Sequence, residues 1–392
     1  MKMWSFGSYY LQKLSEHDVL YSCGMPLYHA SAGGMGTGMM MHTGCCQVLR
    51  QKFSASRWME DVKRYNVTAI QYIGELCRYI LNRCPVSPND ADCSIKFAVG
   101  SGLRPDIWVE FQRRFGINEL MECYGATEGT GSLFNTVFLS NLEMGDHPGV
   151  GCVGQIDPSR GFRFARYDVI KDDFFRDEND FLVDSDVGSP GELLIPMLED
   201  NPTSKFYGYT DDEASIQKLL YDPFGDDGLI YFRTGDLLSA DEYNWVRFID
   251  RVGDTFRWKG HNISTTEVAV ELLKFQGVRE ACVIGVEVPG DNDGRAGMAA
   301  IILGNTSPAV FRDLLNHLRM TLPVAAIPIF LRISCNLSVT GTFKYRKQEL
   351  RKQGLDLKGI KDQVYWLDPR VKQYMPFDEE HYRLLMTNKV RL

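Results

Sequence analysis

The first 145 residues alternate between helix-like and strand-like hydrophobic patterns. Apolar side chains recur at helical spacing after Ser54, which is expected to cap the first of these helices, and again after Pro105, whose fixed φ suits the first turn of a helix. Short β-rich runs lie between and after these helices, at 68–73, 95–99 and 117–123. Because strands that alternate with helices form a parallel sheet with right-handed crossovers, this region is predicted to be an α/β unit.

The pattern changes between residues 146 and 249, where glycines, prolines and short β-prone runs replace the alternation. The runs at 191–196 and 231–232 are examples, and they predict a small β-rich subdomain. Beyond residue 250 an α+β pattern returns. Ser264 and Glu267 form a capping box that opens a helix, and strands are expected at 281–288, 298–303 and 327–333.

We therefore predict an α/β protein with three parts: a partial α/β region at 1–145, a β-rich subdomain at 146–249 and a C-terminal α+β domain at 250–392. At 392 residues the chain is too long for one compact core, which agrees with several units.

Residues 231–267 contain two pieces rich in glycine and aspartate, 234–236 and 250–254, on either side of the apolar run 245–249. Both pieces place carboxylates where a strand is expected to end. Polar groups at strand ends can face a ligand while the strands hold them still. The alternative is two ordinary Gly/Asp turns of a β-hairpin, and either piece alone favours that interpretation.

Composition narrows the classes of partner. The chain is 44% hydrophobic and 24% charged, which is typical of globular proteins, and its net charge of −8 argues against nucleic acid as the main partner. Ten cysteines without a Cys-x-x-Cys pair indicate neither a zinc site nor a disulfide framework. No apolar run reaches the roughly 18 to 20 residues that cross a bilayer.

The sequence Tyr-Gly-Ala-Thr-Glu-Gly-Thr follows directly on the strand expected at 117–123. Tyr124 can stack on a flat ring, Thr127 can hydrogen-bond a phosphate, and Glu128 can hold Mg²⁺ as a hard oxygen ligand. Gly125 allows close approach to a ligand. A turn with a surface glutamate accounts for the same residues equally well.

Another glycine turn links a predicted strand to a predicted helix. Its residues are Gly100, Ser101, Gly102 and Leu103. Such a backbone can lie against a nucleotide, but Gly-x-Gly alone is a weak signal and favours an ordinary strand-to-helix connection. His29 stands alone before several small residues, and a lone histidine is more often structural than catalytic.

Two further residues have charges suited to a nucleotide. Asp236 can accept hydrogen bonds from paired hydroxyls such as those of a ribose, or it can simply form a turn. Lys344 follows the flexible sequence Thr-Gly-Thr-Phe, and a long cation there can neutralise charge on a phosphate. A solvated basic turn is the alternative for Lys344.

Together, and in this order, these motifs resemble the adenylate-forming (AMP-binding) superfamily of acyl-CoA synthetases, adenylation domains and luciferases. Tyr-Gly-Ala-Thr-Glu-Gly, Asp-Arg-Val-Gly-Asp-Thr-Phe-Arg-Trp-Lys-Gly and Thr-Gly-Thr-Phe-Lys resemble more closely the family of fatty-acid transport proteins and very-long-chain acyl-CoA synthetases. The resemblance runs from about residue 15 to the end of the chain.

The resemblance implies an acyl-CoA synthetase-like N-terminal domain and a smaller mobile C-terminal domain, with the hinge at Asp250. It implies a nucleotide site in which Asp236 holds the ribose with Arg251 nearby. The residues around the adenine would be Gly100, Ser101, Gly102, Leu103, Tyr124 and Gly125.

The resemblance also implies the catalytic groups. Thr127 would contact the α-phosphate, Glu128 would bind Mg²⁺, and Lys344 would bridge carboxylate and phosphate in the first half-reaction. His29 would border the acyl and phosphate site. The residues facing the pantetheine tunnel in the second half-reaction would be Trp258, Lys259 and Gly260.

The function implied is that of a long- or very-long-chain fatty acid CoA ligase that uses ATP, Mg²⁺ and CoA, associated peripherally with a peroxisomal or endoplasmic reticulum membrane inside the cell. The alternatives are a CoA ligase for a secondary-metabolite acid and a non-catalytic acyl- or nucleotide-binding remnant.

The phosphate loop of the family, which ends in Gly-x-Pro-Lys, does not occur in this sequence. We therefore expect a chain that corresponds to the family without its N-terminal phosphate-loop region, and weak ATP/pyrophosphate exchange.

Overall fold

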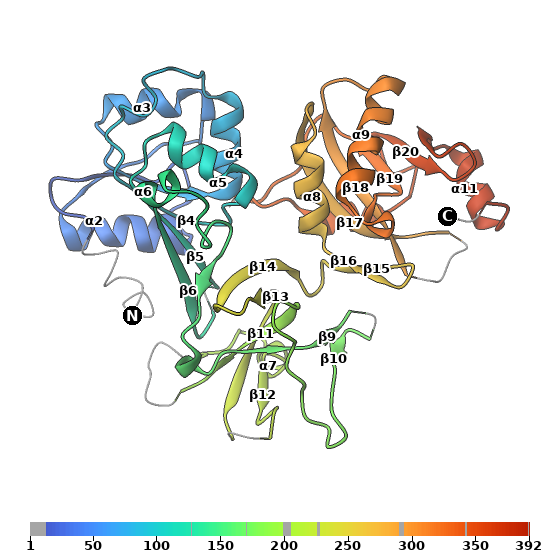
Figure 1. The fold of residues 1–392 in the computed structure, drawn as a ribbon, viewed down its shortest axis with the longest axis horizontal. Coiled ribbons are helices and arrows are strands. Elements are labelled where there is room, and N and C mark those ends of the chain that lie inside the picture. The colour runs from blue at the N-terminus through green and yellow to red at the C-terminus, as the bar shows by residue number, and fades with distance from the viewer. Residues whose placement is uncertain are drawn as a thin grey trace.

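The computed structural model describes residues 13–126, 128–169, 171–198, 205–225, 228–289, 294–341, 343–390 and 392. Three sheets of five or six strands organise this part of the chain, and Figure 1 shows them as a blue to teal unit, a green to yellow unit and an orange to red unit.

The first sheet has the strand order β2-β1-β3-β4-β5-β6. Its strands are β1 (Val19–Tyr21), β2 (Cys46–Val48), β3 (Ala69–Ile73), β4 (Phe97–Ser101), β5 (Glu119–Gly125) and β6 (Ser132–Phe138). Strands β1 to β5 pair in parallel, and β6 pairs with β5 in antiparallel orientation. The predicted parallel α/β sheet is confirmed, with an antiparallel edge strand that the hydrophobic pattern did not predict.

Helices connect the parallel strands. They are the π-helix η1 (Ala30–Thr37), α2 (Gly38–Thr43), the 3₁₀ turn η2 (Ala55–Arg57), α3 (Trp58–Arg64), α4 (Gly74–Arg83) and α5 (Pro105–Arg114), whereas α6 (Leu139–Glu143) follows the antiparallel strand β6. Pro105 occupies the first turn of α5 as predicted. The predicted cap at Ser54 is wrong in detail, because its side chain accepts no capping hydrogen bond and the first turn is 3₁₀. Aromatic packing joins α3 to α5, with the rings of Trp58 and Phe115 centred 4.7 Å apart.

The second sheet is antiparallel and has the order β7-β14-β13-β11-β8, with β12 paired to β13. Its strands are β7 (Gly154–Gln155), β8 (Arg163–Ala165), β11 (Gly191–Pro196), β12 (Leu219–Tyr221), β13 (Ile230–Ala240) and β14 (Trp245–Arg251). Nearby lie η3 (Pro158–Arg160), the hairpin β9 (Tyr167–Asp168) and β10 (Asp173–Phe174), and α7 (Asp212–Ile216). This arrangement confirms a β-rich region after the parallel sheet.

One sequence prediction in this region is wrong. Residues 234–236 are not the end of a strand, because they lie inside the eleven-residue strand β13. Gly235 has a φ of +77°, and the pairing of β13 shifts register on both neighbouring strands close to this point. The piece that resembles a turn in the sequence is therefore an irregularity within a long strand.

The third sheet forms the C-terminal domain. Its strands, in the order β17-β18-β19-β20-β21, are β17 (Val278–Glu287), β18 (Arg295–Leu303), β19 (Phe330–Ile333), β20 (Gln363–Asp368) and β21 (Gln373–Pro376). A hairpin of β15 (Phe256–Trp258) and β16 (His261–Ile263) precedes it. The helices are α8 (Thr265–Lys274), α9 (Pro308–Thr321), η4 (Val324–Ala326), α10 (Lys347–Gln353) and α11 (Glu379–Met386). The predicted cap at α8 is confirmed, because Ser264 Oγ accepts from the Glu267 amide at 3.1 Å.

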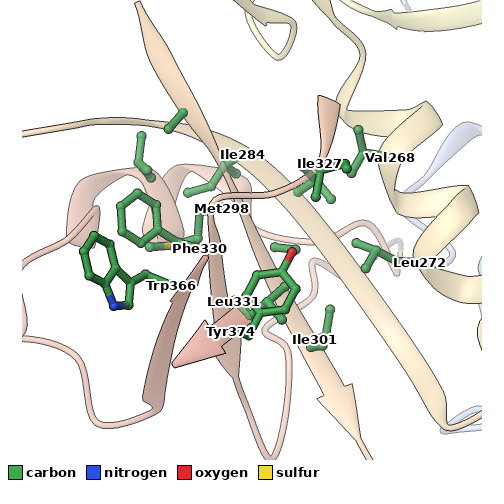
Figure 2. Packing of buried hydrophobic residues seen from close by; sticks show 14 of the residues in the cluster. Val268, Leu272, Ile284, Met298, Ile301, Ile327, Phe330, Leu331, Trp366 and Tyr374 are labelled. Atoms are coloured by element: carbon green, nitrogen blue, oxygen red, sulfur yellow. The ribbon is translucent and has the colours of Figure 1, made fainter. Parts of the chain in front are cut away.

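The core of this domain lies between the sheet and its helices, and Figure 2 shows side chains from several strands and α8 converging on it. Phe330 and Trp366 are both fully buried, and each ring contacts Phe377, at centroid distances of 5.3 and 5.7 Å. The C-terminal domain thus has its own hydrophobic core.

Replacing Phe330 with alanine should lower the unfolding free energy of the C-terminal domain by about 3–5 kcal/mol, because it leaves a cavity in a close-packed core. Urea denaturation followed by circular dichroism measures this change. Val324→Ala is the matched control, since Val324 is 85% exposed and its loss should change stability by less than ~0.5 kcal/mol. A loss for Phe330→Ala as small as that of the control would contradict this description of the core.

Across the described ranges, every helix is too short or too polar to cross a membrane.

Candidate functional site

The first and second sheets meet at Tyr124 and Asp236. Tyr124 lies near the end of β5, and its hydroxyl donates a hydrogen bond to Asp236 Oδ2 at 2.8 Å. Arg251 is directly opposite Asp236 in the pairing of β13 with β14, and its Nε lies 3.5 Å from Asp236 Oδ1. The structure therefore brings together three of the predicted nucleotide-site residues.

The irregularity in β13 is held by a buried acid that sequence reasoning missed. Glu192 is fully buried in β11, where it accepts a hydrogen bond from the Gly235 amide at 3.1 Å and forms a 2.8 Å ion pair with Arg233. Thr234 Oγ1 donates to the Leu193 carbonyl at 2.8 Å. These bonds fix the backbone on both sides of Gly235 and so fix Asp236. A charged residue within the apolar run at 191–196 was the available signal.

Lys218 was also missed, and no pattern in the sequence marks it. Its ammonium lies 3.3 Å from the Arg233 carbonyl, to which it donates, and 5.7 Å from the centre of the Phe232 ring. It supports the backbone just before Asp236 and adds positive charge near that carboxylate.

Burial and neighbouring charges shift the pKa values of Asp236 and Lys344. Burial raises the pKa of Asp236, although the Tyr124 hydrogen bond and the cations Arg251, Lys344 and Lys218 oppose the rise. Burial also lowers the pKa of Lys344, and repulsion from Arg251 adds to this effect. Several cations thus surround one carboxylate, an arrangement that suits a ligand carrying additional negative charge.

Lys344 reaches this cluster from a tight turn in the C-terminal domain. The Thr340 amide donates to the Lys344 carbonyl at 2.8 Å, and the Lys344 amide donates to Thr340 Oγ1 at 3.1 Å. Beyond the turn, Val339 and Tyr345 form an isolated antiparallel bridge. These hydrogen bonds and the bridge stabilise the short loop that carries Lys344.

His29 has both a structural role and a place near the lysine. As the N-terminal cap of η1, its Nδ1 accepts from the Ser31 amide at 3.3 Å and lies 2.8 Å from Ser31 Oγ. Burial lowers the pKa of His29, and the nearby charge of Lys344 lowers it further. The imidazole therefore lies near the charge of the lysine.

Glu128 lies against the second sheet. Its Oε1 accepts from the Tyr209 hydroxyl at 3.1 Å, and the Tyr209 ring packs on Phe206, which in turn packs on Phe232 of β13. Thr127 lies outside the described residues.

Within the described ranges, His, Cys, Asp and Glu form no group of three or more that could hold a metal ion. Glu128 fits Mg²⁺ only as a single protein carboxylate, with phosphate and water oxygens as the other ligands.

The glycine turn after β4 is fixed by Glu122, another buried acid that sequence reasoning missed. The Glu122 carboxyl accepts hydrogen bonds from the Gly102 amide, from the Leu103 amide at 3.3 Å and from the Tyr72 hydroxyl at 2.7 Å. Burial raises the pKa of Glu122 to about 8 despite these bonds. A side chain at Gly100 would lie 2.2 Å from the Tyr72 carbonyl, so only glycine fits there. Ser101 is exposed beside it.

The structure places Trp258, Lys259 and Gly260 apart from this cluster, on the β15–β16 hairpin, which packs on β17, β18 and η4. The Trp258 ring is buried in the core of the C-terminal domain. Lys259 and Gly260 form the exposed turn, with φ values of +47° and +82°. Only these two are accessible to a ligand in this arrangement.

Asp250 ties the second sheet to the C-terminal domain. Its buried carboxylate accepts from the Thr265 amide at 2.6 Å, from Thr265 Oγ1 at 2.7 Å and from the Arg251 amide at 2.9 Å. Because Thr265 begins α8, the predicted hinge residue is bonded to both sides of the connection.

A cavity of about 970 Å³ opens elsewhere, between the end of β17, α10 and α11. None of the predicted site residues lines it, and its charged side chains are of both signs. The cluster around Asp236, where named groups converge, is the better candidate site.

Comparisons with known proteins show which proteins this chain is similar to. A family model described as AMP-binding enzyme matches residues 1–195. Long-chain fatty acid transport protein 6 of mouse is 40% identical over all of this chain and 60% of its own length. Long-chain fatty acid transport protein 2 of rat is 39% identical over 97% of this chain and 59% of its own length. The chain thus spans about 60% of the length of these curated relatives.

Solved structures share the fold. MatB of Rhodopseudomonas palustris with bound ATP has a TM-score of 0.69 at 20% identity, over 90% of this chain and 63% of that one. The O-succinylbenzoate CoA synthetase of Bacillus subtilis in complex with AMP has a TM-score of 0.65 at 22% identity, over 92% of this chain and 64% of that one.

Proposed function

Because this chain belongs to the family of AMP-binding enzymes that includes the long-chain fatty acid transport proteins, we propose that its site serves fatty acyl-CoA synthesis through an acyl-adenylate. The observation that carries the proposal is the meeting of Tyr124 from the first sheet, Asp236 and Arg251 from the second sheet, and Lys344 from a loop of the C-terminal domain. A carboxylate, an aromatic ring and two cations match the ribose, base and phosphate of AMP.

In this proposal the nucleoside lies between the first and second sheets. The two oxygens of Asp236 accept hydrogen bonds from the ribose hydroxyls, and Arg251 stays beside them. The adenine packs against Tyr124 and Gly125 and along the backbone of the turn from Gly100 to Leu103. Glu122 keeps that turn rigid, so little ordering is needed when the nucleotide binds.

The phosphate end lies toward Lys344. In the first half-reaction a fatty acid carboxylate oxygen attacks the α-phosphorus of ATP, and pyrophosphate leaves. Lys344 neutralises charge that develops on the α-phosphate, and Thr127 and His29 border it. Glu128 would hold Mg²⁺ together with phosphate oxygens, and the ion would supply further positive charge there.

The second half-reaction needs another surface of the C-terminal domain. The sulfur of CoA attacks the acyl carbonyl, loses its proton, and displaces AMP. The exposed turn at Lys259 and Gly260 borders the pantetheine in this step, which requires rotation of the domain about Asp250.

The two half-reactions provide the test. We expect the 392-residue chain to convert supplied oleoyl-adenylate and CoA to oleoyl-CoA, since the residues for this step are present. ATP/pyrophosphate exchange should be at least about 100-fold slower than in a family member that contains Gly-x-Pro-Lys, because no such loop holds the β- and γ-phosphates. Both rates can be measured by chromatography of labelled products.

The outcomes separate the alternatives. Thioester formation with long-chain but not aromatic adenylates supports the fatty acid assignment, and the reverse preference supports a secondary-metabolite ligase. Binding of AMP without any thioester would support a non-catalytic remnant. Fast exchange by this chain would show that its own residues replace the phosphate loop.

We also propose a peripheral location at a peroxisomal or endoplasmic reticulum membrane, on the basis of the family resemblance alone.

A further inference from the structure

Lys347 begins α10 shortly after Lys344, and its ammonium is bound at two points. The Nζ atom donates to Asp254 Oδ2 at 2.8 Å and to Thr265 Oγ1 at 2.6 Å. Asp254 lies in the turn that follows β14, close after Asp250, whereas Thr265 begins α8. The lysine therefore ties the start of α10 to the segment after Asp250 and to the start of α8.

The bond to Thr265 continues to Asp250. The Thr265 hydroxyl, which accepts from Lys347, donates to Asp250 Oδ2 at 2.7 Å, and the Thr265 amide donates to the same oxygen at 2.6 Å. Thr265 and Asp250 are both fully buried, and hydrogen bonds to a charged group are strongest where water is excluded. An unbroken series of hydrogen bonds thus joins Asp250 to the first residue of α10.

A second cation binds the same carboxylate from the next turn of α10. Arg351 Nη2 donates to Asp254 Oδ1, whereas Lys347 binds Oδ2. Residues four apart lie on one face of a helix, so both cations reach the carboxylate together. Burial acts to raise the pKa of Asp254, but the charges and hydrogen bonds of Lys347 and Arg351 hold it below its usual value. Asp254 is therefore ionised at neutral pH.

The other end of α10 is fixed to the sheet of the C-terminal domain. Arg332 of β19 donates from Nη1 to Oε1 of Gln353, the last residue of α10, and from Nε to Asp362 Oδ2 at 2.6 Å. The Ser334 hydroxyl donates to the same Asp362 oxygen at 2.7 Å. Because Arg332 is buried, α10 cannot shift along β19 without breaking polar contacts that water replaces poorly.

The loop that carries Lys344 is bonded to the start of α10. The Arg346 amide donates to the Ser338 carbonyl at 2.9 Å, and Arg346 Nε donates to the Val339 carbonyl at 3.2 Å. With the bridge between Val339 and Tyr345, these bonds hold the two sides of the loop together. A shift of α10 would therefore move Lys344 with it.

We propose that three side chains of the C-terminal domain fix the position of Lys344 relative to the hinge at Asp250. They are Asp254, Lys347 and Arg351, called here the Asp254 network. All three are positioning residues, because they act on the Lys344 loop and touch no reacting atom. The part of the network in catalysis rests on the proposed function, but its support of the loop does not.

Hydrogen-deuterium exchange of the 392-residue chain tests the network without substrate. Lys347→Met keeps most of the length of the side chain and removes the charge, so exchange at residues 338–341 and 343–347 should become about tenfold faster. Asp254→Asn keeps the shape and one acceptor, and its effect should be about threefold. Amides of β19 should be unaffected. Lys352→Met is the control, since it removes an exposed lysine from the same helix.

A double variant tests whether the two residues act as one network. Asp254→Asn combined with Lys347→Met should speed exchange by much less than the product of the single effects. An effect equal to that product would contradict a shared network, and unchanged exchange in both single variants would overturn the proposal. Equal acceleration throughout the C-terminal domain, β19 included, would also overturn it, because the side chains would then support the whole fold.

A measurement on the chemistry links the network to the lysine. In single-turnover assays Lys347→Met should slow acyl-adenylate formation about tenfold, because a displaced ammonium no longer meets the α-phosphate. Thioester formation from supplied oleoyl-adenylate should stay within about threefold. Equal slowing of both steps would contradict a positioning role. Faster exchange of the loop in a chain that forms no acyl-adenylate would support the network and contradict only the proposed function.

Discussion

Replacing Asp236 with alanine should weaken the binding of AMP to this chain by at least about 100-fold. The proposed carboxylate accepts two hydrogen bonds from the ribose, and charge-assisted bonds of this kind contribute about 1.5–3 kcal/mol each. The substitution also removes the acceptor for the Tyr124 hydroxyl, and this hydrogen bond positions the ring that is proposed to pack against the adenine. Isothermal titration calorimetry with AMP measures the change.

Two variants make the result specific to the site. Glu242→Ala removes an exposed carboxylate from the turn that follows β13 and should leave the affinity within about twofold, as expected for a distant surface residue. Asp236→Asn keeps the shape and one acceptor, so its affinity should be intermediate. If Asp236→Ala binds AMP as well as Glu242→Ala does, Asp236 does not hold the ribose.

Replacing Lys344 with methionine should slow acyl-adenylate formation by about 100- to 1000-fold, because the transition state loses a cation aimed at the α-phosphate. Methionine keeps most of the length of the side chain and removes the charge. The rate is best measured in single turnovers of labelled oleate with ATP and the chain in excess, so that slow formation is still detected.

The second half-reaction is the internal control for this variant. Thioester formation from supplied oleoyl-adenylate and CoA should stay within about threefold of the unmodified chain, since Lys344 is proposed to act only in the first step. Lys352→Met removes an exposed lysine from α10 and should affect neither step. Equal losses in both half-reactions would show that Lys344 supports the fold or the nucleotide site in general.

Hydrophobic periodicity predicted the strands that are long and separated by helices. Strands β3, β4 and β5 each have five or more residues with a helix before or after them, and all three are observed. Strands β1 and β2 have three residues each, which is too short for an alternation of apolar and polar residues to be recognised. Strand β6 carries a buried Asn135, whose amide donates to the Cys152 carbonyl at 2.8 Å, so its pattern is partly polar.

The geometry of the site depended on contacts that are distant in sequence. Local rules assign Thr-Gly-Asp to a turn, but Glu192 holds Gly235 within β13 from a position 43 residues earlier. Likewise, nothing near Asp236 indicates Tyr124, whose hydroxyl donates a hydrogen bond to it from a position 112 residues earlier. The sequence motifs indicate the groups that are proposed for the site, whereas their tertiary partners decide where each group lies.

The most direct measurement is a crystal structure of this chain with an oleoyl-sulfamoyl adenosine, a stable analogue of the acyl-adenylate. We predict ribose hydroxyls within hydrogen-bond distance of Asp236, adenine against Tyr124 and the turn at Gly100, and the sulfamoyl group beside Lys344. A ligand bound with its ribose away from Asp236 would contradict the proposed site.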